Sequence, residues 1–400
     1  MSDQPLAGVT VLDLSRVAAG PFATMMMADM GAAIIKIERP GTGDEVRALG
    51  RPLPGGDPTK SDYYVGLNRS KRSVAVDLSQ QRGAELVRRL AAAADVVVEN
   101  FRPGVAQRLG LGFDALQEVS PGLVYTSITG FGPSGPWSNR PANDIMMQSI
   151  SGLMGVTGEA GGAPVRIGTS LSDYATGLFA LAATLAALYA RERFPEGQHV
   201  EVPMLNASLA LLPNLVPSAM AGVRPRRMGR GHPQIMGYAS FQCADGGYVT
   251  VGAFSETFWR RLCRVLGHIE WLTDPRFATN TSRLNHRDLI DPVLTAEFLT
   301  RTRAEWVDVL EAADVPCAPV LELDEALRSD QALHNRVSVT VKDGAYSYDV
   351  VNTPFRCGEW DDAAPRPAED LGASTRAVLS DVLGMPPSEV DAVVRDGIAG

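Results

Sequence analysis

The chain has 400 residues, 45% of them hydrophobic, and its 46 acidic residues exceed its 37 basic ones to give a net charge of -9. A chain of this length suits two folded domains better than one. The acidic balance, without any dense block of Lys or Arg, argues against a nucleic-acid partner and against a membrane surface.

Cysteine usage and the first residues bear on the compartment. Cys243, Cys263, Cys317 and Cys357 stand far apart, with neither zinc-ligand nor disulfide-framework spacing, so we predict no metal site. The opening MSDQPLAGVTVLDLS lacks the basic-then-apolar order of a signal peptide. We therefore expect a cytoplasmic protein.

Short β-branched runs alternate with helical periodicity over the first part of the chain. The runs occupy 9–14, 32–38, 73–78, 95–101 and 123–130, and each ends in polar or glycine residues. Between two of them, Leu86, Val87 and Leu90 recur at helical spacing. This alternation predicts an α/β fold with a Rossmann-like parallel sheet, which binds its ligand at the carboxyl ends of the strands.

The later elements predict a second domain. The apolar run 174–190 is shorter than the roughly 20 residues that span a bilayer, so we predict a buried core helix. GQHVEVPML gives one more strand, and a Pro- and Gly-rich linker runs to about residue 222. Asp245-Gly246-Gly247 predicts a hairpin turn. We predict a large domain over 1–222, a smaller α+β domain over 223–330 and a C-terminal segment over 331–400.

Three common enzyme classes lack their sequence markers. Only Gly20 precedes the first helix, so the Gly-x-Gly-x-x-Gly turn of a nicotinamide dehydrogenase is missing. The sequence also contains neither a P-loop nor the Gly-x-Ser-x-Gly of a serine hydrolase. Basic residues instead recur near strand ends, where they suit phosphate groups or are simply solvated; these are Arg16, Arg39, Lys71, Arg72 and Arg102.

The segment RPANDIMMQSISGLMGVTG places Asn143 and Asp144 directly before an apolar helical run. Both residue types cap helices, because their side chains accept hydrogen bonds from the first turn. A carboxylate at a helix start is also a candidate nucleophile, since the helix N-terminus keeps it ionised. The following loop carries Gly161 and Gly162, whose backbone N–H groups could stabilise an oxyanion, although a plain surface turn has the same composition.

The chain resembles the family III CoA-transferases, which include the formyl-CoA:oxalate and carnitine CoA-transferases and, as close relatives, the α-methylacyl-CoA racemases. The resemblance covers essentially the whole length. It is carried by VLDLSRVAAGPFATMMMADMGAAIIKIERPGTGDEVR, LNRSKRSVAVDL, DVVVENFRPGVAQRLGLGFDAL, TGFGPSGPW, NDIMMQSISGLMGVTG and GHPQIMGYASFQCADG. It implies a large domain completed by the C-terminal segment, an interlocked homodimer, and CoA and acyl-CoA as substrates, with no permanently bound cofactor.

The resemblance also implies roles for individual residues. The family's CoA contacts match Arg39, Lys71, Asn100, Phe101 and Arg108. The family's nucleophilic aspartate is matched to Asp144. We therefore expect the Asp144 carboxylate to attack a donor thioester, which gives a mixed anhydride and then an aspartyl-CoA thioester.

One position separates the two branches of the family. Racemases carry a His immediately before the matched aspartate, whereas this chain has Asn143, which cannot exchange a proton near neutral pH. The second racemase aspartate aligns with Asp173, which we expect to order the site or to start the long helix. His232 is expected to border the active site, or only to form hydrogen bonds in its loop.

We therefore predict an enzyme that moves CoA from an acyl-CoA donor to a small carboxylic or dicarboxylic acid, with succinyl-CoA as the candidate donor. Arg226, Arg227 and Arg230 could hold the free carboxylate of a dicarboxylate, or could form a solvated charge cluster. The alternatives are an α-methylacyl-CoA racemase or epimerase and a non-catalytic CoA-binding protein.

Overall fold

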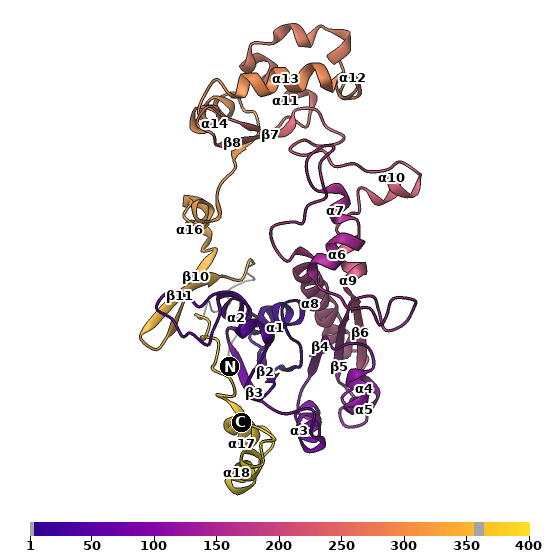
Figure 1. The fold of residues 1–400 in the computed structure, drawn as a ribbon, viewed down its shortest axis with the longest axis vertical. Coiled ribbons are helices and arrows are strands. Elements are labelled where there is room, and N and C mark those ends of the chain that lie inside the picture. Colours follow the sequence, from indigo (N-terminus) through magenta and orange to yellow (C-terminus); the bar gives the residue numbers. More distant parts are fainter. Residues whose placement is uncertain (1–3, 356–363) are drawn as a thin grey trace. The chain divides into compact units, whose positions relative to one another are not determined.

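The computed structural model describes residues 4–355 and 364–400, so Cys357 lies outside the described residues. The chain forms two compact units, whose elements can be followed in Figure 1. Unit 1 comprises Met1–Leu153, Ile167–Asn214 and Gln331–Gly400, and unit 2 comprises Met154–Arg166 and Leu215–Asp330. Two short helices, α7 (Leu153–Val156) and α16 (Asp330–Asn335), lie where the chain passes from one unit to the other.

Unit 1 is built on a six-stranded parallel sheet, which confirms the predicted α/β class. Its strands lie in the order β3-β2-β1-β4-β5-β6. Their bounds are β1 Thr10–Asp13, β2 Ala33–Glu38, β3 Lys71–Ala75, β4 Val96–Glu99, β5 Val124–Thr129 and β6 Gln198–Pro203. The strand order reverses between β1 and β4, and such a reversal opens a ligand crevice beyond the carboxyl ends of the strands.

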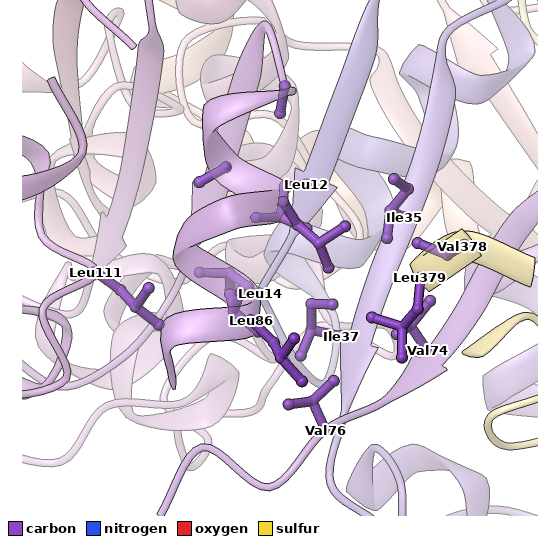
Figure 2. Close-up of a cluster of buried hydrophobic side chains, with 14 of the residues drawn as sticks. Leu12, Leu14, Ile35, Ile37, Val74, Val76, Leu86, Leu111, Val378 and Leu379 are labelled. Atoms are coloured by element: carbon purple, nitrogen blue, oxygen red, sulfur yellow. The ribbon is translucent and has the colours of Figure 1, made fainter. Parts of the chain in front are cut away.

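Helices cover both faces of this sheet because its strands are apolar on both sides. In β1, Val11 packs into the core shared with α1 (Ala19–Asp29) and α8 (Leu171–Arg191), whereas Leu12 packs into the opposite core. Figure 2 shows that opposite core, in which Val378 and Leu379 from the C-terminal segment lie near Val74. It also receives α3 (Gln81–Ala92), α5 (Phe113–Gln117), α17 (Thr375–Asp381) and α18 (Pro387–Arg395).

The long helix α8 packs against the sheet and against α1. By length and composition alone it could cross a membrane, but half of its apolar window is buried and it packs against α1, β5 and β6. Gly177 permits the close approach to α1, because a Cβ there would lie 2.6 Å from the carbonyl oxygen of Ala19. The predicted helix is therefore confirmed, although it is buried on one side only, because Leu178, Phe179 and Tyr189 are exposed.

The remaining elements of unit 1 are short helices and one hairpin outside the parallel sheet. They are η1 (Glu45–Arg47), α2 (Asp62–Asn68), α4 (Val105–Arg108), α6 (Asp144–Ile150), α9 (Met204–Leu209) and the antiparallel hairpin β10 (Ser338–Asp343) and β11 (Tyr346–Val351).

Unit 2 is an antiparallel sheet packed against helices. The sheet has the order β7 (Tyr238–Gln242), β8 (Tyr248–Gly252) and β9 (Cys317–Pro319), and the predicted hairpin at Asp245-Gly246-Gly247 is confirmed. Trp259, Phe298 and Trp306 fill its core. Its other elements are α10 (Val216–Met220), α11 (Glu256–Leu266), η2 (Ile269–Leu272), η3 (Pro275–Phe277), α12 (Asn280–Asn285), α13 (Arg287–Phe298), α14 (Arg303–Ala312) and α15 (Leu323–Leu327).

Candidate active site

A network of buried charges supports the carboxyl ends of the first strands. Asp13, the last residue of β1, accepts hydrogen bonds from Thr24 Oγ1 at 2.7 Å and from Lys71 Nζ at 3.1 Å. Burial by itself would raise the pKa of Asp13, but Lys71 and Lys36, with bonds from Ser15 and Thr24, lower it to about 2. The carboxylate therefore stays ionised inside the protein and fixes the turn that follows β1.

Lys71 belongs to this network rather than to an open surface. It is 3% exposed, and its ammonium also donates to the carbonyl oxygen of Pro21 at 2.9 Å and to Asn68 Oδ1 at 3.1 Å. Burial lowers the pKa of Lys71 to about 8, with a further lowering by Lys36 and an opposing effect of Asp13. Lys71 lines neither of the cavities described below. Its contacts are therefore those of a structural ion pair.

A cavity of about 740 Å³ opens beyond the ends of β1 and β2. Arg16 and Arg39 lie in its lining, as does Phe101 after β4. The Arg16 guanidinium lies 2.6 Å from Glu45 Oε1, whereas that of Arg39 is exposed and forms no ion pair with the residues that the structure describes. Acidic residues line the cavity as well, namely Glu38, Asp44, Glu45 and Asp77. Arg16 and Lys36 are paired with two of them, so Arg39 is the lining cation that remains available to a phosphate group.

A second cavity, of about 270 Å³, shares Arg16 and Phe101 with the first and extends toward the start of α8. Asn100 holds the shared region together, because its Nδ2 donates to the carbonyl oxygen of Arg16 at 2.8 Å and its Oδ1 accepts from the Arg16 N–H at 2.9 Å. Further lining residues are Arg102, Arg140, Asn143 and Asp173. The two cavities are therefore adjacent, with Arg16 and Phe101 between them.

Val17 shapes the wall of this smaller cavity. Its φ of 68° lies in the left-handed region, which is strained for a β-branched residue. The Asp44 carboxylate holds the strained turn by accepting hydrogen bonds from the Val17 N–H at 3.1 and 3.2 Å. No local pattern predicts this strain, because a valine normally indicates extended backbone.

The two acidic residues near the smaller cavity have different surroundings. Both oxygens of Asp144 accept hydrogen bonds, one from Gln148 Nε2 at 2.8 Å and one from the backbone N–H of Ser172 at 2.9 Å. Asp144 is 8% exposed and is absent from the cavity lining. Its carboxylate thus ties the start of α6 to the first turn of α8.

Asp173 lines the cavity and accepts no hydrogen bond from any residue within 4–355 or 364–400. Burial, followed by the negative charge of Asp144, raises the pKa of Asp173 to about 7. The Asp173 carboxylate can therefore reach a ligand in the cavity, and burial leaves it poorly solvated by water. Such a group is unusually reactive when ionised.

The comparison with protein families decides the class of the enzyme. Residues 6–375 match the family described as CoA-transferase family III. The chain is a member of that family. This confirms the relationship and the enzyme class that the sequence blocks predicted.

Named relatives agree over nearly the full length. Mouse succinyl-CoA:glutarate CoA-transferase is 35% identical over 399 residues, which are 99% of this chain and 91% of that protein. Acetyl-CoA:oxalate CoA-transferase of Acetobacter aceti is 36% identical over 378 residues, covering 93% and 95% of the two chains. The crystal structure of a CAIB/BAIF family protein from Brucella suis has a TM-score of 0.83 and 31% identity, and covers 96% of this chain and 100% of its own.

Within this CoA-transferase, the other predicted contacts are divided between cavity and surface. Arg102 is exposed and lines the smaller cavity, together with Asn100 and Phe101. Arg72 lies 3.4 Å from Asp381 in an ion pair, and Arg108 is exposed on α4 outside both linings. Arg140 lines the smaller cavity and was missed at the sequence level, because a lone arginine before a proline carries no recognisable signal.

The remaining predicted residues of the transferase belong to unit 2. Arg227 donates to the carbonyl oxygens of Gly162 at 3.1 Å and Gly155 at 3.3 Å, and so fixes the loop that contains Gly161. The His232 ring accepts from the Gln234 N–H at 3.1 Å and packs edge-on against Tyr238.

Two of the three candidate arginines for a dicarboxylate are therefore occupied within unit 2. Arg227 holds the loop, and Arg230 contacts the Ser240 carbonyl oxygen at 3.3 Å and Thr295 Oγ1 at 2.5 Å. Arg226 is exposed. Among the described residues, no group of three or more His, Cys, Asp or Glu side chains could hold a metal ion.

Proposed function

We propose that this transferase moves CoA from succinyl-CoA to a short dicarboxylic acid. The named relatives support this substrate class, since they include succinyl-CoA:glutarate, succinate–glutarate and acetyl-CoA:oxalate CoA-transferases. The smaller cavity supports it as well, because two arginines, Arg102 and Arg140, line it beside Asp173. A guanidinium binds a carboxylate with parallel hydrogen bonds, which suits an acid that carries a second, unreacting carboxylate.

In this proposal the nucleotide end of CoA occupies the larger cavity, with Arg39 and Arg16 near its phosphates. The pantetheine arm passes Phe101 and Asn100 and brings the thioester into the smaller cavity. The support is that the two linings share Arg16 and Phe101. CoA binds as a substrate, and no permanently bound cofactor is proposed.

We further propose Asp173 as the nucleophile, in place of the sequence-based candidate Asp144. One observation carries this choice: the Asp173 carboxylate lines the cavity and accepts no hydrogen bond among the described residues, whereas both oxygens of Asp144 are engaged. Asp144 then acts on the reaction through its charge, which raises the pKa of Asp173, and through its hold on Ser172.

The reaction would proceed through covalent intermediates on Asp173. A carboxylate oxygen of Asp173 attacks the carbonyl carbon of succinyl-CoA, the C–S bond breaks, and CoA leaves as a thiolate. The succinyl group remains on Asp173 as a mixed anhydride. The thiolate attacks the aspartyl carbonyl, which releases succinate and leaves an aspartyl-CoA thioester. The acceptor carboxylate then attacks this thioester and displaces the thiolate. Attack of the thiolate on the acceptor carbonyl completes the new acyl-CoA and restores Asp173.

The assembly and location are proposed from the resemblance and the composition. We propose an interlocked homodimer that works in the cytoplasm. Size-exclusion chromatography with light scattering tests the dimer, because the monomer mass of 42.7 kDa should be doubled.

The decisive experiment combines acyl exchange with isotope incorporation. The protein is incubated in deuterated water with succinyl-CoA and glutarate, oxalate or a monocarboxylic acid, and separately with a 2-methylacyl-CoA, and every CoA ester is identified by mass spectrometry. We expect new dicarboxylyl-CoA esters without α-deuterium, lost in Asp173→Asn and reduced but present in Asp144→Asn. The reverse ranking of the two variants would return the nucleophile to Asp144. Deuterium at the α-carbon without acyl exchange would identify a racemase. Binding of CoA without either reaction would identify a non-catalytic CoA-binding protein.

A further inference from the structure

The side chain of Asn143 has one end fixed and one end free. Asn143 is the N-cap of α6, and its Oδ1 accepts a hydrogen bond from the Met146 N–H at 3.1 Å. Because a backbone N–H can bond only to the oxygen of the amide, the cap determines which way the amide group is turned. The Nδ2 group, with its two N–H donors, is then turned away from the Met146 N–H, and it donates to no residue in the described part of the chain.

Asn143 and Asp173 line the same cavity. The attack proposed above forms a C–O bond to Asp173 and moves the carbonyl π pair onto the oxygen of the thioester. That negative charge develops near two carboxylates, Asp173 itself and the buried Asp144. A fixed, neutral donor stabilises such an oxyanion without attracting the free carboxylate of the substrate in the ground state.

We propose that Asn143 Nδ2 donates a hydrogen bond to the carbonyl oxygen under attack, which makes Asn143 a catalytic residue of the acyl-transfer steps. The proposal rests on the proposed function and adds the residue that stabilises the charge. The cap matters to it directly, because the Met146 N–H holds the amide in place and removes the reorganisation that a mobile side chain would need.

The test separates donation from capping with matched variants. Asn143→Ser keeps a good N-cap but removes the amide donor, whereas Asn143→Ala removes both. Succinyl-CoA is mixed with each protein without an acceptor acid, and intact-protein mass spectrometry follows the gain of CoA as the aspartyl thioester. We expect this rate and kcat to fall about 10²-fold to 10³-fold in Asn143→Ser, the usual effect of losing one oxyanion donor, with KM and Tm near the wild-type values. Asn143→Ala should lose the same rate and also melt at a lower temperature.

Several results would overturn the proposal. A wild-type rate in Asn143→Ser, with a reduced Tm in Asn143→Ala, would mean that Asn143 only caps α6. A raised KM with an unchanged kcat would assign Asn143 to ground-state binding instead. Failure of the proposed function looks different, because the wild-type protein would then neither gain CoA nor exchange acyl groups. A CoA adduct that persists in Asp173→Asn would move the nucleophile away from Asp173.

Discussion

The donor half-reaction should depend steeply on pH, because burial and the charge of Asp144 raise the pKa of Asp173 to about 7. A nucleophilic carboxylate must be ionised. With this pKa, about 1% of Asp173 is ionised at pH 5 and about 90% at pH 8, so the rate should rise about ninety-fold between them. An aspartate with its ordinary pKa would change by less than about 1.1-fold over the same interval.

The assay is the rate of aspartyl-CoA formation from saturating succinyl-CoA at a series of pH values. Asp144→Asn removes the negative charge that raises the pKa of Asp173 in the wild type, so the inflection of the variant's pH profile should lie at lower pH. This shift assigns the titration to Asp173 rather than to a phosphate of CoA, which titrates similarly with both proteins. A rate that stays constant from pH 5 to pH 8, or an inflection that is unmoved in Asp144→Asn, would refute the reasoning.

Three further changes test the scaffold of the site by thermal or urea unfolding. Gly177→Ala should cost about 1–3 kcal/mol, because its Cβ would meet the Ala19 carbonyl oxygen, whereas Gly66→Ala on α2, with no atom within 4 Å, should be neutral or stabilising by up to about 1 kcal/mol; equal effects would contradict the close α1–α8 contact. Glu99→Gln should stabilise the protein by about 3 kcal/mol more at pH 8 than at pH 4. Burial raises the pKa of Glu99 to about 7, so in the wild type stability is lost as pH rises from the unfolded value toward 7; parallel pH profiles of the two proteins would exclude this. Arg47→Met should cost about 3–5 kcal/mol, because it removes the guanidinium that pairs with the buried Glu38 carboxylate. An unchanged unfolding midpoint would show that this ion pair does not stabilise the protein.

The sequence predicted the parallel sheet and the family because both depend on local patterns. Strand runs, helical spacing and ordered blocks of residues can all be read along the chain. The same reasoning predicted a helix start at Asn143 and Asp144, and the structure has Asn143 as the N-cap of α6. A cap is a contact between residues three positions apart, so it also leaves a local signal.

The site itself depends on contacts between distant segments, which no local pattern reveals. Lys71 is of a residue type that binds phosphate groups, but its ammonium forms a buried ion pair with Asp13, 58 positions away. The choice between Asp144 and Asp173 has the same origin. Asp144 accepts a hydrogen bond from the distant Ser172 N–H, and only the folded chain indicates that Asp173, its neighbour on α8, lines the cavity.

The division of the chain has a consequence for synthesis on the ribosome. All of unit 2 has been synthesised once residue 330 has emerged. Unit 1 is complete only after its last segment, Gln331–Gly400, has followed. Val378 and Leu379 fill part of the core that covers one sheet face. Until they arrive, that face exposes apolar strands of a parallel sheet, which are prone to aggregation. A truncation before α17 should therefore bind chaperones, although every residue that lines the two cavities would already have been made.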